Sequence, residues 1–326
     1  MGARREEGKA PMKLCQFQTP GTGRRVGLVE GNTVIDITTR QEGIVSVLDL
    51  LLRGRTAAGI ERIARRLARA PRRPRYTWTA LDRTPGARRA GLLAPLDPPE
   101  VWGAGITYRR SAEYYTEHET RETARAKGIY DYVYESERPE LFFKGTAPRC
   151  VAPHAPIGLR GDSKLTAVEA ELACVVGVGG RIVAYTAGND VSAWDIEREN
   201  PLFLPQSKIF RGSFALGPVI ATPQTVQDAH ALTIRCAIER GGRVIYEGQA
   251  STRDLKRRCD ELVDWLTRYN PVPAGTVLST GTGILVPDEH ALQPGDVVSI
   301  TIDRIGTLRN PVRRLDARGG LTSTTG

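Results

Sequence analysis

A glycine-rich turn between two apolar segments is the feature that most limits how this chain can fold. Residues 168–176 and 181–190 are mostly apolar, and they are separated by Gly177, Val178, Gly179 and Gly180. Apolar segments joined by a short glycine-rich turn predict a β-hairpin. We therefore expect two antiparallel strands here, and these strands determine where their few polar side chains point.

Three carboxylates lie on this hairpin. Glu169 and Glu171 are two residues apart, so they project from one face of the first strand. A two-residue turn centred on Val178–Gly179 or on Gly179–Gly180 places Asp190 on that same face, whereas a three-residue loop would break the relationship. Converging carboxylates favour a bound cation, and oxygen ligands suit Mg²⁺, with Mn²⁺ or Ca²⁺ as alternatives. A solvated strand face is the other interpretation.

The rest of the chain divides into two zones. Residues 12–95 predict a small N-terminal α+β domain, with strands and helices expected at 12–17, 25–29, 33–36, 44–52 and 57–69. Residues 100–315 predict a β-rich domain with helices near 111–127 and 254–269. Strands and helices do not alternate regularly, so the expected class is α+β, not a doubly wound parallel sheet. Residues 316–326 are rich in glycine, serine and threonine and predict a disordered tail.

The charge excess is local. The chain has 46 lysines and arginines against 37 acidic residues, a net charge of +9. Ten arginines lie within residues 61–90, partly on the outer face of the amphipathic helix expected at 57–69, whose apolar stripe starts at Ile60. We interpret this segment as a solvated arginine-rich face. The alternative from a different functional class is a nucleic-acid binder, but no helix-turn-helix, zinc finger or RNA-binding aromatic motif accompanies the arginines.

Cysteine usage and the N-terminus predict a cytoplasmic protein. The five cysteines are odd in number and show no metal-type spacing. No apolar run is long enough to span a membrane, and residues 1–11 show no export signal. Met12, which opens the first expected strand, is an alternative start to Met1.

Several motifs, in order, resemble those of the fumarylacetoacetate hydrolase family. The resemblance covers about residues 101–313, and its motifs are residues 188–196, Lys208, residues 216–218, residues 279–282 and residues 305–312. The family resemblance implies a mixed β-roll catalytic domain, a homodimer and a divalent metal, usually Mg²⁺. Carried onto this chain, the metal ligands are Glu169, Glu171 and Asp190, the same set that the hairpin brings together.

Residues 137–144 and 197–209 resemble the sugar-acid branch of that family. The family's carbon–carbon hydrolases usually carry a water-activating histidine three residues after a tyrosine, but here Ser111 stands three residues after Tyr108. A serine cannot serve as the resting base at neutral pH. Trp194 replaces an arginine common in the family, so the contact made by that arginine is open. The resemblance implies Mg²⁺-dependent dehydration of a 2-keto-3-deoxy sugar acid of the arabinonate type to 2-oxoglutarate semialdehyde, through a stabilised enolate.

The same resemblance suggests roles for further residues. Glu140 is expected to be the general acid and base, its pKa raised by apolar neighbours, and Lys208 to orient the substrate. The expected substrate contacts are Phe142, Ser111 and either Thr280 or Thr282. The expected partner is a small anionic 2-keto acid, with neither membrane nor nucleic acid. An acylpyruvate-type carbon–carbon hydrolase or a 2-keto acid decarboxylase on the same site is the alternative, and Glu140 and Lys208 could instead be surface residues.

Overall fold

The structure, a computed structural model, describes residues 11–117 and 129–322. The helix expected at 111–127 begins as α4 (Arg109–Glu117), and residues 118–128 lie outside the described residues. Met1 also lies outside the described residues, as do residues 323–326 at the end of the expected tail. Residues 316–322 form a turn in which the N–H of Asp316 donates to the carbonyl of Gly320 at 2.8 Å.

Within the described residues, twelve strands form one mixed sheet. Ten of them follow the order β4-β3-β2-β1-β14-β12-β11-β17-β6-β7, with β5 beside β1 and β8 beside β14. Their bounds are β1 Lys13–Gln18, β2 Arg24–Glu30, β3 Thr33–Asp36, β4 Arg75–Thr77, β5 Gly91–Leu92, β6 Val101–Gly105, β7 Glu140–Gly145, β8 Cys150–Val151, β11 Ala170–Val176, β12 Ile182–Asp190, β14 Phe214–Ala221 and β17 Val277–Ser279.

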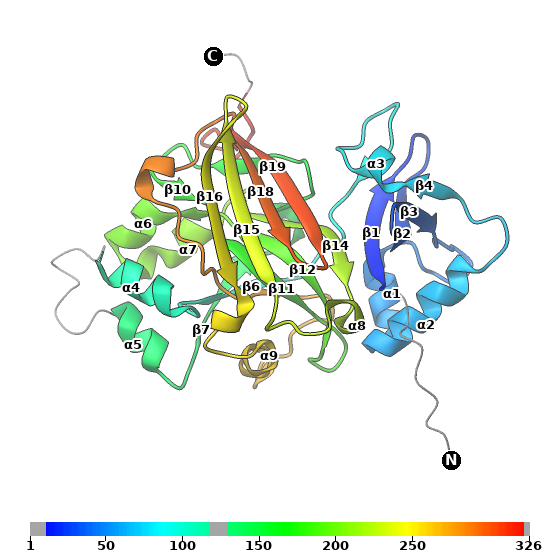
Figure 1. The fold of residues 1–326 in the computed structure, drawn as a ribbon, viewed down its shortest axis with the longest axis horizontal. Helices are drawn as coiled ribbons and strands as arrows, with labels where there is room; N and C mark the ends of the chain where they lie inside the picture. Colours follow the sequence, from blue (N-terminus) through cyan, green and yellow to red (C-terminus); the bar gives the residue numbers. More distant parts are fainter. Residues whose placement is uncertain (1–10, 118–128, 323–326) are drawn as a thin grey trace.

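A second sheet packs against the central strands of the first (Figure 1). In the same described ranges its order is β16-β15-β18-β19-β9, and a separate pair, β10 and β13, forms a small ribbon. The bounds are β9 Ile157–Leu159, β10 Thr166–Ala167, β13 Ser192–Ala193, β15 Thr233–Arg240, β16 Arg243–Ser251, β18 Val297–Ile302 and β19 Gly306–Arg314.

Short helices flank the sheets (Figure 1). Besides α4 they are α1 Val47–Gly54, α2 Ala57–Ala68, α3 Trp78–Leu81, α5 Ile129–Glu135, α6 Trp194–Glu199, α7 Leu204–Lys208, α8 Pro223–Val226 and α9 Cys259–Thr267. The described residues also contain four 3₁₀ turns, η1 Ala147–Arg149, η2 Pro201–Phe203, η3 Thr252–Asp254 and η4 Asp288–His290. In the part of the chain that the structure describes, no helix is both long and apolar enough to cross a membrane.

The α+β class with large mixed sheets is confirmed, and among the described strands no barrel closes. The N-terminal strands continue the main sheet, because β1 pairs with β14 as well as with β2. The division into 12–95 and 100–315 stays a prediction.

Alternate residues of β11 belong to different hydrophobic clusters. Leu172 and Cys174 pack with β15 and β18, whereas Ala173 and Val175 pack with β1, β2, α1 and α2. Since side chains alternate along a strand, Glu171 shares the face of Ala173 and Val175. The hairpin carboxylates thus occupy one end of an otherwise apolar face, and the interpretation as a solvated strand face is wrong.

The hairpin register depends on a bulge. The expected two-residue turn is wrong, because the N–H of Gly177 donates to the carbonyl of Arg181 at 2.7 Å, which leaves a three-residue loop. On its own this loop would place Asn189 opposite Glu169. A β-bulge near the loop shifts the pairing by one residue. Beyond the bulge the N–H of Asp190 donates to the carbonyl of Glu169 at 3.0 Å, which returns Asp190 to the carboxylate face.

Candidate active site

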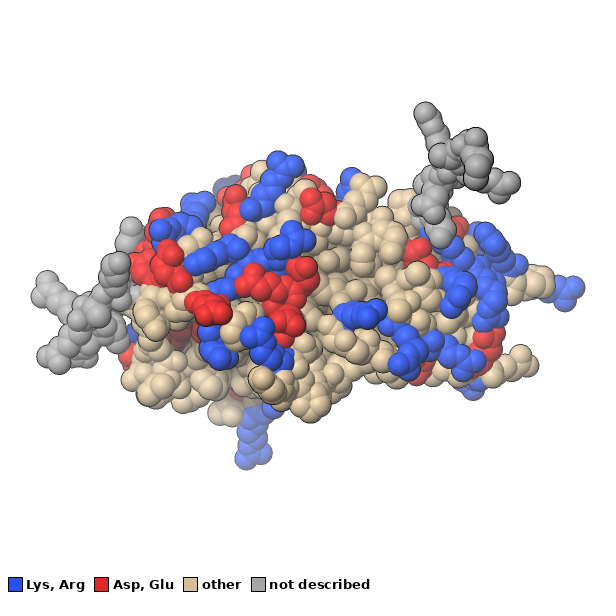
Figure 2. All heavy atoms as spheres, turned by 90° about the horizontal axis from the view of Figure 1, so that it is seen from below, with Lys and Arg blue, Asp and Glu red and all other residues tan. Residues whose placement is uncertain are grey.

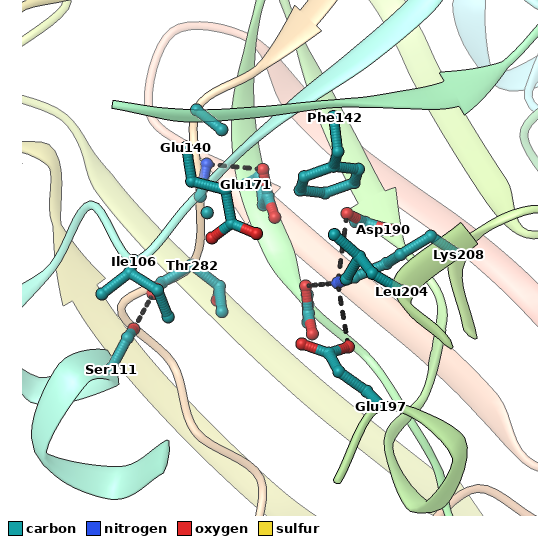
Figure 3. A pocket seen from close by; sticks show the side chains of 14 residues that line it. Ile106, Ser111, Glu140, Phe142, Glu171, Asp190, Glu197, Leu204, Lys208 and Thr282 are labelled. Atoms are coloured by element: carbon teal, nitrogen blue, oxygen red, sulfur yellow. Dashed lines mark hydrogen bonds and ion pairs between the residues drawn. The ribbon is translucent and has the colours of Figure 1, made fainter. Parts of the chain in front are cut away.

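A small cavity of about 30 Å³ lies at the carboxylate end of the β11–β12 hairpin (Figure 3). It is lined by Ala104, Gly105, Ile106, Ser111, Glu140, Phe142, Glu169, Glu171, Asp190, Glu197, Leu204, Lys208, Gly281 and Thr282. Residues far apart in the sequence therefore meet here, and all but one of the site residues expected from the sequence are among them.

The three hairpin carboxylates could hold a metal ion. One oxygen from each of Glu169, Glu171 and Asp190 lies within 4.8 Å of the others, and all three side chains are buried. The hydroxyl of Ser279 and the N–H of Gly281 both donate to Oε2 of Glu171, at 2.5 and 2.7 Å. Burial, followed by the charges of Asp190 and Glu169, raises the pKa of Glu171 well above its ordinary value. A cation would relieve this repulsion.

Lys208 places an ammonium group among these carboxylates (Figure 3). Its Nζ donates to Oε2 of Glu169 at 2.8 Å and to the hydroxyl of Ser192 at 2.7 Å, and lies 3.5 Å from Oδ2 of Asp190. Burial opposes the charge on Lys208, but Asp190, Glu169 and Glu197 outweigh it and hold the lysine pKa well above its ordinary value. Lys208 is therefore a charged group fixed inside the cavity.

Glu140 reaches the cavity from β7. In the register of β6 and β7, Gly105 lies opposite Glu140 and Gly103 lies opposite Phe142. A Cβ added at either glycine would overlap the facing side chain, so the two glycines make room for the glutamate and the ring. Burial first, and then the charge of Glu197, raises the pKa of Glu140 to about 7. A carboxyl with such a pKa can both accept and return a proton near neutral pH.

Only one of the two threonines expected to contact the substrate lines the cavity. Thr282 lines the cavity and its hydroxyl donates to the carbonyl of Ala170 at 3.1 Å. Thr280 is not among the lining residues; it is fully buried, and its hydroxyl donates to the carbonyl of Leu172 at 2.8 Å. Ser111 lines the cavity, and its hydroxyl donates to the carbonyl of Thr282 at 2.5 Å. Of the two threonines, the structure brings only Thr282 to the other site residues.

Sequence reasoning missed two charged residues. Lys144 is fully buried, forms an ion pair with Oδ1 of Asp190 and donates to the carbonyl of Val191 at 2.9 Å. It follows Glu140 and Phe142 at alternate positions of β7, so strand alternation could have found it. Glu197 on α6 lines the cavity 3.8 Å from Lys208, and its sequence gave no comparable signal.

The charges of the site fit a divalent cation. Four buried carboxyl groups and the half-buried carboxyl group of Glu140 meet two buried ammonium groups, which leaves a formal charge of −3 when all are ionised. The five acids are Glu140, Glu169, Glu171, Asp190 and Glu197, and the two bases are Lys144 and Lys208. Oxygen ligands of this number suit Mg²⁺ and similar hard ions. The residues present therefore fit a metal held by the three hairpin carboxylates.

Residues 101–313, which contain every residue of this cavity, match the family described as fumarylacetoacetate (FAA) hydrolase, C-terminal. The chain belongs to the fumarylacetoacetate hydrolase family. The matched segment covers the sequence motifs from which the resemblance was predicted, so this prediction is confirmed.

Relatives within the family are close in sequence. The chain is 46% identical over 223 residues to the 2-dehydro-3-deoxy-D-arabinonate dehydratase of Saccharolobus solfataricus, covering 68% of this chain and 74% of that protein. It is 45% identical over 218 residues to a probable 2-keto-3-deoxyxylonate dehydratase of Haloferax volcanii, covering 67% and 73%.

A solved member of the family has the same fold. The structure described as 2-keto-3-deoxy-D-arabinonate dehydratase complexed with magnesium and 2,5-dioxopentanoate aligns with a TM-score of 0.77 and 36% identity. The alignment covers 93% of this chain and 99% of that one. The two chains thus share their fold over nearly their whole lengths.

Proposed function

We propose that this protein is a Mg²⁺-dependent dehydratase that converts a 2-keto-3-deoxy sugar acid of the arabinonate type to 2-oxoglutarate semialdehyde. The observation that carries the proposal is the placement of Glu140, with its pKa raised to about 7, in the same cavity as the three hairpin carboxylates. The two dehydratases named above support the same reaction.

The metal would be held by Glu169, Glu171 and Asp190, and its charge would stabilise the negative charge that develops on the 2-keto acid when C3 loses a proton. Glu140 accepts that proton on a carboxylate oxygen. It then returns a proton to the C4 hydroxyl, which leaves as water. The C3=C4 double bond that remains moves to C4=C5 as one proton leaves C5 and one adds to C3. The resulting enol takes a proton at C4 while its hydroxyl loses one, which gives the aldehyde at C5 and a product that differs from the substrate by one water.

Lys208 and Phe142 shape the other side of the site. The Lys208 ammonium group lies 5.2 Å from the centre of the Phe142 ring, which restricts where the charge can point. From this position Lys208 orients the substrate's oxygen atoms by its charge. Thr282 and Ser111 contact the substrate at the cavity wall, and Phe142 excludes water from it.

The lining residues favour this reaction over carbon–carbon hydrolysis. The hydrolytic alternative needs a group that activates water, and Ser111, at the place expected for that group, uses its hydroxyl hydrogen to bond the carbonyl of Thr282. No histidine is among the residues that line this cavity in the described chain. Glu140 is thus the residue with a suitable pKa for proton transfer.

A substrate panel tests the proposal. The purified protein with Mg²⁺ should release 2-oxoglutarate semialdehyde from 2-keto-3-deoxy-D-arabinonate, and EDTA or Glu171→Ala should abolish the release. Release of pyruvate from an acylpyruvate, without turnover of any 2-keto-3-deoxy sugar acid, would contradict the dehydratase and support the hydrolase. Carbon dioxide release from a 2-keto acid would support the decarboxylase in the same way.

We propose further that the protein works in the cytoplasm as a homodimer. All five cysteines are free thiols, and four are buried, which suits a reducing compartment. The dimer follows from membership of the family. Light scattering of the purified protein tests it, and a mass equal to one chain at micromolar concentration would contradict it.

A further inference from the structure

A hollow lined by arginines lies on the N-terminal part of the molecule and shares no residue with the active-site cavity. It measures about 590 Å³. Its lining residues are Glu30, Ile35, Arg65, Ala68, Arg69, Ala70, Arg72, Arg73 and Arg75. Figure 2 shows lysine and arginine side chains gathered over this end of the molecule. The proposed dehydration uses none of these residues.

The local fold explains why the arginines converge. Helix α2 buries Ile60, Ala64 and Leu67 against the β1–β3 strands, so Arg69 at its end faces outward. The chain then turns back and β4 pairs with β3, which brings Arg75 opposite Ile35. Three successive pieces of chain, the end of a helix, a turn and a strand, thus surround one hollow.

One arginine of the turn holds this shape. Arg73 donates from Nε to the carbonyl of Leu67 at 3.1 Å and from Nη1 to the carbonyl of Thr38 at 2.7 Å. These bonds tie the turn both to α2 and to the segment after β3. The backbone around the hollow is therefore held in place by these two hydrogen bonds.

Three of the arginines that line the hollow form no ion pair with a described carboxylate. Its walls carry five arginines against a single acid, Glu30. Arg69, Arg72 and Arg75 are exposed, and none of the described carboxylates lies within ion-pair distance of them. A concave surface with this charge concentrates anions, because the field lines of its walls converge in the hollow.

We propose that this hollow binds a small molecule through two or more phosphate groups. The planar guanidinium group of arginine matches the oxygens of a phosphate with paired hydrogen bonds. The volume is within the range of small-ligand pockets, and Ile35, Ala68 and Ala70 give it an apolar floor. A nucleoside diphosphate or an inorganic polyphosphate would present this chemistry.

A nucleic acid suits the hollow less well. The arginines line a concavity, whereas a duplex is contacted by elements that project into its grooves. No aromatic side chain lines the hollow among the described residues, so bases would have nothing to stack on. Tyr76, which follows Arg75, packs its ring edge-on to Phe17 with the centroids 5.1 Å apart.

Titration calorimetry on the full chain at low ionic strength tests the proposal with inorganic triphosphate, inorganic pyrophosphate, ADP and a short DNA duplex. Triphosphate should bind at one site per chain, and Arg69→Gln with Arg72→Gln should weaken it by about tenfold or more, as expected for the loss of charge-assisted hydrogen bonds. The matched control is Arg243→Gln with Arg253→Gln, which removes two exposed arginines elsewhere and should leave the affinity unchanged.

The other outcomes decide between ligands. Tighter binding of ADP than of inorganic pyrophosphate would support a nucleotide whose base contacts the apolar floor, and equal binding would support the polyphosphate. The proposal would be overturned if neither ADP nor an inorganic polyphosphate bound, or if only the DNA duplex bound. It would also be overturned if both double variants lost the same affinity for triphosphate. Unchanged melting curves in plain buffer would exclude misfolding as the cause of a lost affinity.

Discussion

The indole N–H of Trp194 donates a hydrogen bond of 2.7 Å to Oε1 of Glu169, while Lys208 donates to Oε2 of the same carboxylate. Trp194 is fully buried at the start of α6, so its ring has no room to turn. Its donor therefore fixes the orientation of one proposed metal ligand. Where an arginine is common in the family, this chain therefore has a tryptophan, whose neutral N–H donates to the carboxylate of Glu169.

Trp194→Phe should weaken Mg²⁺ binding by about tenfold or more, because partners that orient a metal ligand are worth that much. Titration calorimetry with Mg²⁺ measures the effect without turnover. The matched control is Trp102→Phe, because the Trp102 indole donates to Glu100 at 2.9 Å and neither residue lines the cavity. An unchanged Mg²⁺ affinity in Trp194→Phe, or an equal loss in both variants, would contradict the positioning role.

Gly105→Ala should displace Glu140 without removing it, because the added Cβ would overlap the glutamate side chain. We expect the turnover number to fall by about 100-fold, the usual cost of a misplaced catalytic group, while Mg²⁺ affinity stays the same. Gly23→Ala is the control, since a Cβ there meets nothing within 4 Å. Wild-type turnover in Gly105→Ala would mean that Glu140 does not carry the proton.

The faces of the strands could be predicted from the sequence, because side-chain alternation is a local property. It placed Glu169 and Glu171 together, and applied to β7 it would have added Lys144 to Glu140 and Phe142. The position of Asp190 was predicted for a reason that is only half right. The loop has three residues, and the bulge that corrects the register depends on packing that no local pattern encodes.

Residues on loops and short helices were harder to place. Thr280 and Thr282 are both next to Gly281 and both donate to a backbone carbonyl, and the fold leaves only Thr282 at the cavity wall. Glu197 approaches Lys208 because α6 and α7 pack together. Contacts of this kind come from tertiary structure, so a single sequence cannot show which of these residues reaches the cavity.

Lys208→Met should destabilise the metal-free protein by about 3–5 kcal/mol, the usual cost of leaving a buried charge without its partner. Glu169 would then lose the ammonium group that lies 2.8 Å from its Oε2, and Asp190 would keep only its ion pair with Lys144. Mg²⁺ should recover more stability in this variant than in the wild type, since it would replace the missing charge. Denaturant unfolding with EDTA measures the loss of stability, and unfolding with Mg²⁺ measures the recovery. An equal effect of Mg²⁺ on the two proteins would contradict a metal site beside Lys208.

The pH dependence of the reaction should follow Glu140. Burial and the charge of Glu197 raise the pKa of Glu140 to about 7. A base works only when ionised, so kcat/KM should rise with pH through this value and be lost below it. Lys208, Glu169 and Asp190 also act on Glu140, but they remain in place when Glu197 is changed.

Glu197→Gln should therefore move the acidic limb of kcat/KM to lower pH, by about one unit, because a neutral neighbour no longer opposes ionisation of Glu140. The profile is measured at saturating Mg²⁺. Glu199→Gln is the matched control, since it removes the same charge from an exposed position of the same helix. A limb that stays in place in Glu197→Gln, or moves equally in both variants, would show that Glu197 does not set the pKa of the catalytic carboxyl.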